Sequence, residues 1–500
     1  MNVMEESPAH LVSSCAMQSS EKYSRGFSKY EWTLVVLFIL SLPLSNPWVR
    51  GDGVGYYAYA RALLTEHRLD FRDDWLRANA SFRMGRIDAQ GNVAQDQYTL
   101  TGHLDNHFSI GPAILWLPFL MIVHVGVHLY DALGGHVPTD GFSEPYFITM
   151  AAATALYGFA GLWLSFRLAR EYFDERWAFL ATLGIWWGSS LAVYMYFNPS
   201  WSHVHSAFTV ALFFWYWVRT RYARGVMQWV ILGLIAALMM NVYYLSAVFL
   251  LLPLLESLAG YRAAFKAAGA GQLSRLLLKN IVFSAAVLAG LLPTLIAKKI
   301  IYGSYFNLGY SEHWYWWSPA FFKVCFSADH GLFSWTPILI LAVTGLFLLQ
   351  RCDRNLAIYS ITVFVVYLYA IGCYQDWDGM SSFGNRFFVS LTPIFILGMA
   401  ALFDSLARVM HERPAAIFAS SMTAAFILWN LGLVFQWGTH LIPARGPISW
   451  RDAAHNQVSA VPREASETLE KYFAGRKQFM NRVEEEDVKG LKSGQSGGTE

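Results

Sequence analysis

One carboxylate, Asp52, stands where its neighbours and its place in the chain suit it to chemistry. It lies in the stretch Gly51-Asp52-Gly53-Val54-Gly55, directly after an apolar segment at 32–44 that ends in Ser-Asn-Pro. We therefore expect the carboxylate where a membrane helix meets polar solvent, and the glycines allow a tight turn and close approach of a ligand. Such an aspartate can serve as a general base. It can equally be the N-cap of the next helix, since Asp is a favoured cap residue.

A helical pattern follows the aspartate, with Tyr56, Ala60, Leu63 and Leu64 on one face. An amphipathic helix of this kind lies along a membrane surface, with its tyrosines at the depth of the lipid headgroups. Tyr56 and Tyr57 are therefore candidate substrate contacts beside Asp52.

The composition is typical of a polytopic membrane protein. Of the 500 residues, 55% are hydrophobic and only 14% are charged, and the apolar residues come in long blocks. The net charge of +2 and the lack of a basic arm give no sign of a nucleic-acid partner. The four cysteines are far apart and form no CxxC, so they predict neither a disulfide framework nor a zinc site. We interpret the first apolar segment as an uncleaved anchor.

The basic residues of the short loops set the expected topology, because loops rich in Lys and Arg stay in the cytoplasm. They cluster in alternate loops, from 167–176 to 408–413. All clusters lie on the same side of the membrane as the N-terminus only if the segment 110–130 does not cross the membrane. The glycine, prolines and histidines of this segment favour a surface-lying or re-entrant course. We therefore expect an all-α bundle of about eleven spans and one juxtamembrane segment. The predicted spans are 32–44, 146–166, 177–197, 203–219, 226–242, 244–260, 279–301, 332–350, 356–374, 386–408 and 415–437.

This topology predicts three parts in a multi-pass protein of the inner membrane. Residues 1–30 form a cytoplasmic tail, and 31–440 form a membrane domain whose long first outer loop, 48–145, carries juxtamembrane helices. Residues 441–500 form an outer tail that is charged, then rich in Gly and Ser, and is expected to be partly disordered.

The outer loops then collect the polar residues on one face of the membrane. Flat aromatic rings pack against a sugar, carboxylates accept from its hydroxyls, and cationic or N–H donors hold phosphate oxygens. The mixture therefore predicts a site for a sugar next to a lipid phosphate. Candidate substrate contacts are His203, His205, Trp316, Asp376 and Asp378, and candidate phosphate contacts are His103, His107 and Arg386.

Each of these candidates has a plainer interpretation. The tryptophans around Trp316 suit an interfacial belt, and Arg386 at a span end can reach to the surface. His203 and His205 do not share a helical face, so they predict no metal pair. Asp376 and Asp378 can hold a divalent ion or simply face solvent.

The order of these features resembles the GT-C superfamily of membrane glycosyltransferases, which use polyprenyl-phosphate sugars as donors. The likeness is to the bacterial branch related to protein mannosyltransferases and the lipid A aminoarabinose transferase. As architecture it covers about 30 to 440. At the level of motifs it covers Asp52 with Tyr56-Tyr57-x-Tyr59-x-Arg61, then Gly111-Pro112-x-x-x-Trp116-x-Pro118, and Arg167-Leu168-Ala169-Arg170.

The resemblance implies that Asp52 is the catalytic base and that His103 or His107, before the juxtamembrane segment, contacts the lipid phosphate. The chain departs from many relatives in having Gly53 after the aspartate, where they carry a second acidic residue. It also has His203 and His205 where many carry an aspartate. No cofactor is expected; a divalent metal is possible but not expected.

These features predict an inverting glycosyltransferase of the cell envelope that acts on the outer membrane face. Its partners would be a polyprenyl-phosphate-linked sugar, membrane lipids and an unidentified glycan, lipid or protein acceptor, with no nucleic acid. A solute transporter or flippase is the alternative, and it would carry ionisable residues at mid-depth. An assembly subunit without a reactive site would share the same topology.

Overall fold

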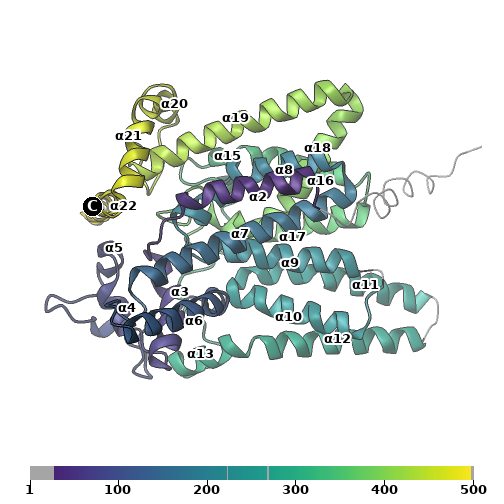
Figure 1. Ribbon diagram of the computed structural model, residues 1–500. Coiled ribbons are helices and arrows are strands. Elements are labelled where there is room, and N and C mark those ends of the chain that lie inside the picture. Colours follow the sequence, from purple (N-terminus) through teal and green to yellow (C-terminus); the bar gives the residue numbers. More distant parts are fainter. Residues whose placement is uncertain (1–26, 222, 267–269, 497–500) are drawn as a thin grey trace, which may run out of the picture.

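The computed structural model describes residues 27–221, 223–266 and 270–496, so most of the predicted N-terminal tail, including Cys15, lies outside it. Its described residues are helical with three isolated bridges and no strands, which confirms the all-α prediction. Each of the eleven predicted spans overlaps a helix of the bundle in Figure 1, although several bounds differ. These helices are α2 (Lys29–Ser41), α7 (Glu144–Tyr172), α8 (Glu175–Gly188), α9 (His203–Thr220), α10 (Val226–Val242), α11 (Leu251–Lys266), α12 (Ala270–Gly290), α16 (Ile338–Leu349), α17 (Arg354–Cys373), α18 (Thr392–Met410) and α19 (Glu412–Gly438).

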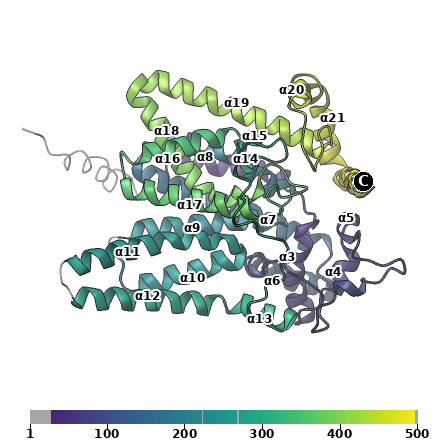
Figure 2. The same cartoon turned by 180° about the vertical axis from the view of Figure 1, so that it is seen from behind.

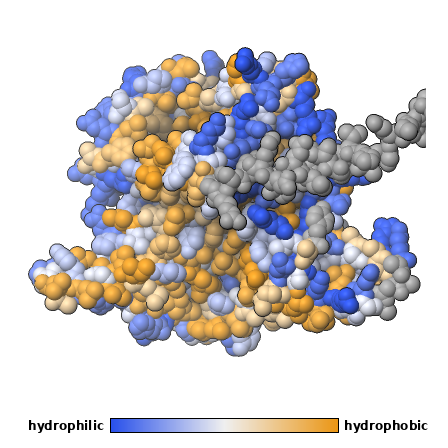
Figure 3. All heavy atoms as spheres, turned by 45° about the vertical axis from the view of Figure 1, so that its right-hand side comes forward, coloured by the Kyte–Doolittle hydropathy of each residue, from blue (hydrophilic) through white to orange (hydrophobic). Residues whose placement is uncertain are grey.

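The lateral surface of the bundle is apolar enough for a membrane. Within the described residues, seven helical segments are long and apolar enough to cross one, and α10 and α16 are shorter apolar helices. Large apolar side chains such as Ile281, Leu288 and Leu428 are exposed on α12 and α19. Orange apolar residues accordingly cover much of the face seen in Figure 3. Exposed apolar surface on this scale needs lipid around it.

Charged pairs join helix ends at one end of the bundle, where the far ends of α7, α9 and α18 lie, on the right in Figure 1. Glu31 at the start of α2 pairs with Arg167 (2.9 Å) and Arg170 (3.1 Å) near the end of α7. Arg221 after α9 pairs with Asp353 before α17. We call this the basic end. The segregation of charge that the sequence predicts is therefore present in the fold.

At the opposite end, which we call the loop end, several long polar loops meet. Ser109 Oγ donates to the carbonyl of Val242, the last residue of α10 (2.6 Å), and Gln375 N donates to the His313 carbonyl (3.0 Å). Lys298 of α13 (Leu292–Tyr302) donates to three carbonyls at residues 106–108. Figure 2 shows α13 beside α6 and α3 from behind. Loops that are far apart in sequence thus form one polar cap.

Helix α6 (Gly111–Ala132) is formed by the segment 110–130, which the sequence predicts not to cross the membrane. Its first turn packs so tightly on α10 that a Cβ on Gly111 would lie 2.3 Å from the Val242 nitrogen. Trp116 then donates to Thr154 (2.9 Å), and His124 lies 2.7 Å from the Tyr146 hydroxyl in the first turn of α7. The helix therefore runs back toward the start of α7, and both its ends lie at the loop end. By length and composition α6 is itself one of the seven candidate spans among the described residues, so its course outside the membrane stays a prediction.

Most of the C-terminal tail is helical within the described residues, and its end, where the sequence predicts disorder, lies partly outside them. It forms α20 (Trp450–Val458), α21 (Ala460–Ala474) and α22 (Arg476–Ser496), and residues 497–500 lie outside the description. Tyr472 is buried and donates to the Leu44 carbonyl (2.7 Å), while Glu484 accepts from Asn79 of the first outer loop (2.9 Å). The charges that suggested disorder lie mainly on exposed faces of amphipathic helices.

The most central span, α18, explains how the fold fixes one functional residue. Its described side chains from Thr392 to Ala401 are buried, and α16 packs directly on it. A Cβ on Gly345 would lie 1.8 Å from the Gly398 carbonyl oxygen, so only glycines permit this approach. The short helix η6 (Arg386–Leu391) continues straight into α18. Arg386 is therefore attached to the most deeply buried of the candidate spans among the described residues.

Reporter fusions test the predicted topology. Fusions at Gly135 and Ser200 should both give a periplasmic signal, and one at Asp174 a cytoplasmic signal, because the first two lie at the loop end and the third at the basic end. A cytoplasmic signal at Gly135 would contradict the placement of both ends of α6 on one side.

Candidate functional site

A cavity of about 600 Å³ opens at the loop end and is built from elements spread over the whole chain. Its volume lies in the range of small-ligand sites. The lining comes from α3, the loop before α6, the start of α9, the turn after α10, the loop after α13 and the segment from α17 to η6. The lining residues are Asp52, Tyr56, His107, Phe108, Ser109, His203, Tyr243, Tyr244, Leu245, Phe306, Asn307, Leu308, Tyr310, Glu312, Trp314, Ile371, Tyr374, Asp376, Met380, Arg386 and Phe387.

Asp52 is the first residue of α3 (Asp52–Arg61), and its side chain does not cap the helix. Gly51 occupies the N-cap position with φ 51°, a conformation that favours glycine. The Asp52 carboxylate Oδ2 instead accepts from Arg386 Nη1 at 2.7 Å. The capping interpretation therefore fails, and the carboxylate keeps 29% of its side-chain surface exposed at the cavity wall.

The glycines around Asp52 serve packing against the protein's own chain. A Cβ on Gly53 would lie 2.0 Å from Ser200 Oγ, and one on Gly55 would lie 1.9 Å from the Phe108 ring. Helix α3 can therefore sit directly on the 198–202 loop and on the loop before α6. Any side chain at either position would push Asp52 away from Arg386.

Arg386 is held almost entirely inside the protein, with 7% of its side-chain surface exposed. Its guanidinium lies 4.5 Å from the centre of the Trp201 ring, a cation–π contact. Its Nε is buried and has no hydrogen-bond partner among the described residues. An arginine with unused donors at a cavity wall is well suited to hold a phosphate.

The predicted histidines divide into two that line the cavity and two that do not. His107 lines it beside Tyr310, and burial lowers the pKa of its imidazole against the opposing effect of nearby carboxylates, so the ring is neutral at pH 7. His203 lines it as a buried ring whose Nδ1 has no partner in the described chain. His103 lies outside, 3.0 Å from the Thr101 hydroxyl. His205 is buried edge-on against Trp116, on the α6 side of α9.

The other predicted substrate contacts divide in the same way. Tyr56 and Asp376 line the cavity, whereas Tyr57 is buried and donates to the Gly141 carbonyl (2.7 Å). Trp316 stacks at 5.1 Å on Trp314, which itself lines the cavity. Asp378 lies outside the lining. Burial first, and then the negative charges of Asp378 and Glu312, raise the pKa of Asp376.

Several lining residues were missed because their loop carries no periodic signal. Glu312, Tyr310 and Trp314 belong to the loop after α13, and the Glu312 Oε2 is buried with no partner in the described chain. The loop is fixed by backbone hydrogen bonds to the end of α17, including Tyr315 N to the Cys373 carbonyl at 2.6 Å. The only hint in the sequence was the dense aromatic run at 314–317, which equally suits an interfacial belt.

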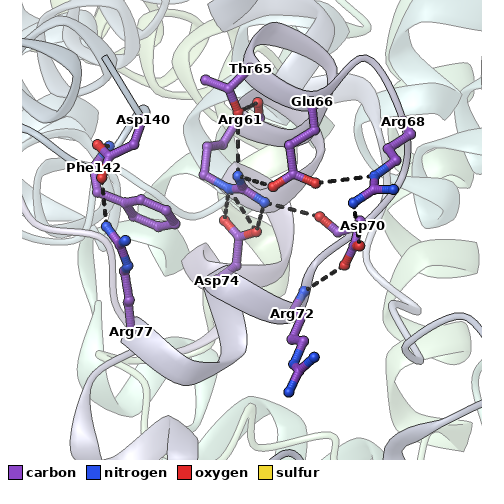
Figure 4. A network of polar contacts seen from close by, with 10 residues as sticks. All are labelled: Arg61, Thr65, Glu66, Arg68, Asp70, Arg72, Asp74, Arg77, Asp140 and Phe142. Carbon is purple, nitrogen blue, oxygen red and sulfur yellow. Dashed lines mark hydrogen bonds and ion pairs between the residues drawn. The ribbon is translucent and has the colours of Figure 1, made fainter. Parts of the chain in front are cut away.

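A buried ion-pair network holds α3 in place (Figure 4). Arg61 binds both oxygens of Asp74 from α4 (Arg72–Arg77), at 2.6 to 2.8 Å, and also Glu66 at 2.6 Å. Burial opposes the charge on Arg61, but the hydrogen bonds and charges of Asp74 and Glu66 outweigh it and raise the arginine's pKa. The network fixes the surface helix that begins at Asp52, so Arg61 is a positioning residue.

No family model matches the chain, and no curated protein sequence matches it. Among solved structures it is similar to ArnT from Cupriavidus metallidurans, crystallised with undecaprenyl phosphate. The identity is 12%, the match covers 81% of this chain and 70% of that chain, and the TM-score is 0.45. A similarity of this degree assigns no role to any residue of this chain.

Removing one partner of the buried network should destabilise the protein. Asp74→Asn leaves Arg61 short of a charge partner and should lower the free energy of unfolding by about 3–5 kcal/mol. Arg77→Ala breaks the exposed pair with Asp140 (2.6 Å) and should cost about 1 kcal/mol or less. Unfolding in detergent measures both, and equal losses would contradict the role given to the network.

Binding of undecaprenyl phosphate tests the phosphate contacts. Arg386→Ala and His107→Ala should each weaken binding roughly 10- to 100-fold, because a hydrogen bond to a charged group contributes about 1.5–3 kcal/mol. Arg386→Lys keeps the charge and should bind with intermediate affinity. Arg351→Ala, an exposed arginine at the basic end, is the matched control. Equal effects of Arg386→Ala, His107→Ala and Arg351→Ala would argue against a phosphate site in this cavity.

Proposed function

We propose that the protein is a membrane glycosyltransferase that moves a sugar from a polyprenyl-phosphate donor to a cell-envelope acceptor, with inversion at the anomeric carbon. The observation that carries the proposal is the Asp52–Arg386 pair at the wall of a 600 Å³ cavity. The pair combines a partly exposed carboxylate with a buried cation that has unused donors. Glycosyl transfer from a phosphate needs both a base and a phosphate ligand.

Arg386 and His107 would bind the donor phosphate. The guanidinium presents N–H groups in a planar fork that matches phosphate oxygens, and the neutral imidazole supplies one further N–H. Their buried setting strengthens these contacts, because charge–dipole interactions are less screened away from water. The cap lies at one end of an apolar bundle, so the prenyl chain can remain in the lipid while its phosphate reaches the cavity.

The rest of the lining suits a sugar ring. Tyr56, Tyr243, Tyr310, Trp314 and Tyr374 provide flat aromatic faces, which pack against the apolar face of a pyranose. Carboxylates of Glu312 and Asp376 also line the cavity, as acceptors for sugar hydroxyls. The unpartnered Glu312 oxygen is an acceptor that a bound hydroxyl would satisfy.

The reaction needs one base. The Asp52–Arg386 ion pair uses Oδ2, and Oδ1 would accept the proton of the acceptor hydroxyl as its oxygen attacks the anomeric carbon. The bond from that carbon to the phosphate oxygen breaks on the opposite face, and the electron pair leaves on the phosphate. Arg386 stabilises this developing charge. Glycosidases need a second carboxylic acid because their leaving group is a poor one, whereas a phosphate leaves as a weakly basic anion.

The proposed location is the inner membrane, with the loop end on the outer face and the basic end in the cytoplasm. It rests on the arginine clusters, which gather at the end opposite the cavity. The acceptor would be a lipid, glycan or protein that meets the cavity from outside. A transporter would instead place its substrate near mid-depth between broken spans. The lining of this cavity comes from loops and helix ends, which favours the transferase.

The variant Asp52→Asn separates the base from any structural role. It keeps the size of the side chain but removes the charge, so transfer should fall by a factor on the order of 10²–10⁴. Transfer from polyprenyl-phosphate sugars is measured in proteoliposomes, with thermal stability alongside. Asp52→Glu, which restores a carboxylate, should recover part of the activity. A stable and fully active Asn variant would remove the base and with it the proposed function.

A further inference from the structure

A second group of polar side chains lies outside the cavity, where two loops of the loop end meet. Asp329 and His330 belong to the loop between α14 (Phe321–Phe326) and α15 (Leu332–Trp335), and Asp378 belongs to the loop at 374–385. One ligand atom from each residue lies within 4.8 Å of the other two. Asp378 lies 48 positions after His330, so the fold brings the two loops together.

The state of His330 points to a ligand at this place. Its side chain is fully buried, and neither ring nitrogen has a hydrogen-bond partner among the described residues. Asp329 Oδ1 lies 3.1 Å from Nδ1 but is not aligned as a hydrogen bond. Buried polar groups are nearly always satisfied in native proteins, so an imidazole left without a partner calls for one. An imidazole nitrogen and carboxylate oxygens are among the ligand types that bind zinc and other transition metals.

The loop that carries Asp329 and His330 is held firmly. Asp329 N donates to Ser327 Oγ (3.0 Å), and the Ala328 carbonyl accepts from Trp335 Nε1 (3.0 Å). The His330 ring lies 5.0 Å from the ring of Trp335, which is itself fully buried. The backbone that carries these two ligands is therefore held in place before any ion arrives, which favours binding.

The geometry points to a divalent transition-metal ion of the Zn²⁺ class, bound by Asp329, His330 and Asp378 as a tie between the two loops. Zinc binds nitrogen and carboxylate oxygen at about 2.0–2.2 Å, so two ligands of one ion lie at most about 4.4 Å apart. The observed separations need only a small inward movement of the side chains. A water molecule would take the fourth position of a tetrahedral ion.

The ion would position the site without touching substrate. Asp378 lies between Asp376, which lines the cavity, and Arg386. The segment between them is internally bonded, with Gly379 N donating to the Asp376 carbonyl (2.9 Å) and Ser382 Oγ to the Gly384 carbonyl (2.9 Å). Fixing Asp378 therefore fixes the loop that presents both cavity residues. The metal site does not depend on the proposed transferase activity.

Zinc content and thermal stability test the site directly. The full-length protein in detergent is stripped with a chelator, given Zn²⁺ and desalted, and its zinc is measured by mass spectrometry. The variants are Asp378→Asn, which preserves shape, and His330→Asn, which tolerates the left-handed backbone at φ 55°. Asp376→Asn, two residues along the same loop, is the matched control. Co²⁺ loaded into the wild-type protein reports the ligands through its visible spectrum.

The wild-type protein and Asp376→Asn should retain about one zinc ion per chain, and zinc should raise the Tm of both. Asp378→Asn and His330→Asn should bind zinc at least tenfold more weakly, with no zinc-dependent rise in Tm. The Co²⁺ spectrum should show nitrogen and oxygen ligation. A wild-type protein that retains no zinc and shows no shift in Tm would overturn the site. So would variants that bind zinc as the wild-type protein does.

Discussion

The ion pair between Asp52 and Arg386 joins residues 334 positions apart, and much of the loop end serves to make it possible. A buried arginine is costly unless a partner carries the opposite charge. Asp52 supplies that charge, and the Trp201 ring supplies a cation–π contact on another side. The carboxylate in turn keeps part of its surface open to the cavity. One partner is thus anchored in the protein while the other remains available for chemistry.

Two kinds of constraint hold the pair together. On the Asp52 side, glycines let α3 lie against Ser200 and Phe108, and the Arg61–Asp74 network fixes the far end of that helix. On the Arg386 side, η6 leads directly into α18, the span most deeply packed in the bundle. The helix that begins at Asp52 and the segment that carries Arg386 are therefore positioned by separate contacts, and the ion pair joins them.

The sequence predicted the helices well because their signal is strong. Long apolar blocks and alternating arginines locate the spans and the two ends without any tertiary information. Asp52 and Arg386 could be found because each stands at a span end. Their direct contact could not be predicted, since nothing local relates positions so far apart. The composition of the tail at 450–496 is charged and gives little sign of its helices, and the expected disorder at the end of the tail stays a prediction.

The prediction of site residues from the sequence was limited mainly because the direction of each side chain could not be predicted. Tyr56 and Tyr57 are neighbours, yet one lines the cavity and the other packs in the core. His203 and His205 differ in the same way, because positions two apart on a helix point in different directions. Glu312 was missed because it lies in an irregular loop whose course is set by hydrogen bonds to α17. Such choices depend on packing and leave no pattern in the sequence.

The most direct test of the pair is the binding of undecaprenyl phosphate to four proteins: wild type, Asp52→Asn, Arg386→Gln and the double variant. If the cavity binds the phosphate through Arg386, removing the neighbouring carboxylate should strengthen binding severalfold, because Asp52 repels the anion and occupies one donor. Arg386→Gln should weaken binding, and adding Asp52→Asn to it should restore little. Binding that is unchanged in all three variants, or weakened in Asp52→Asn, would contradict the account.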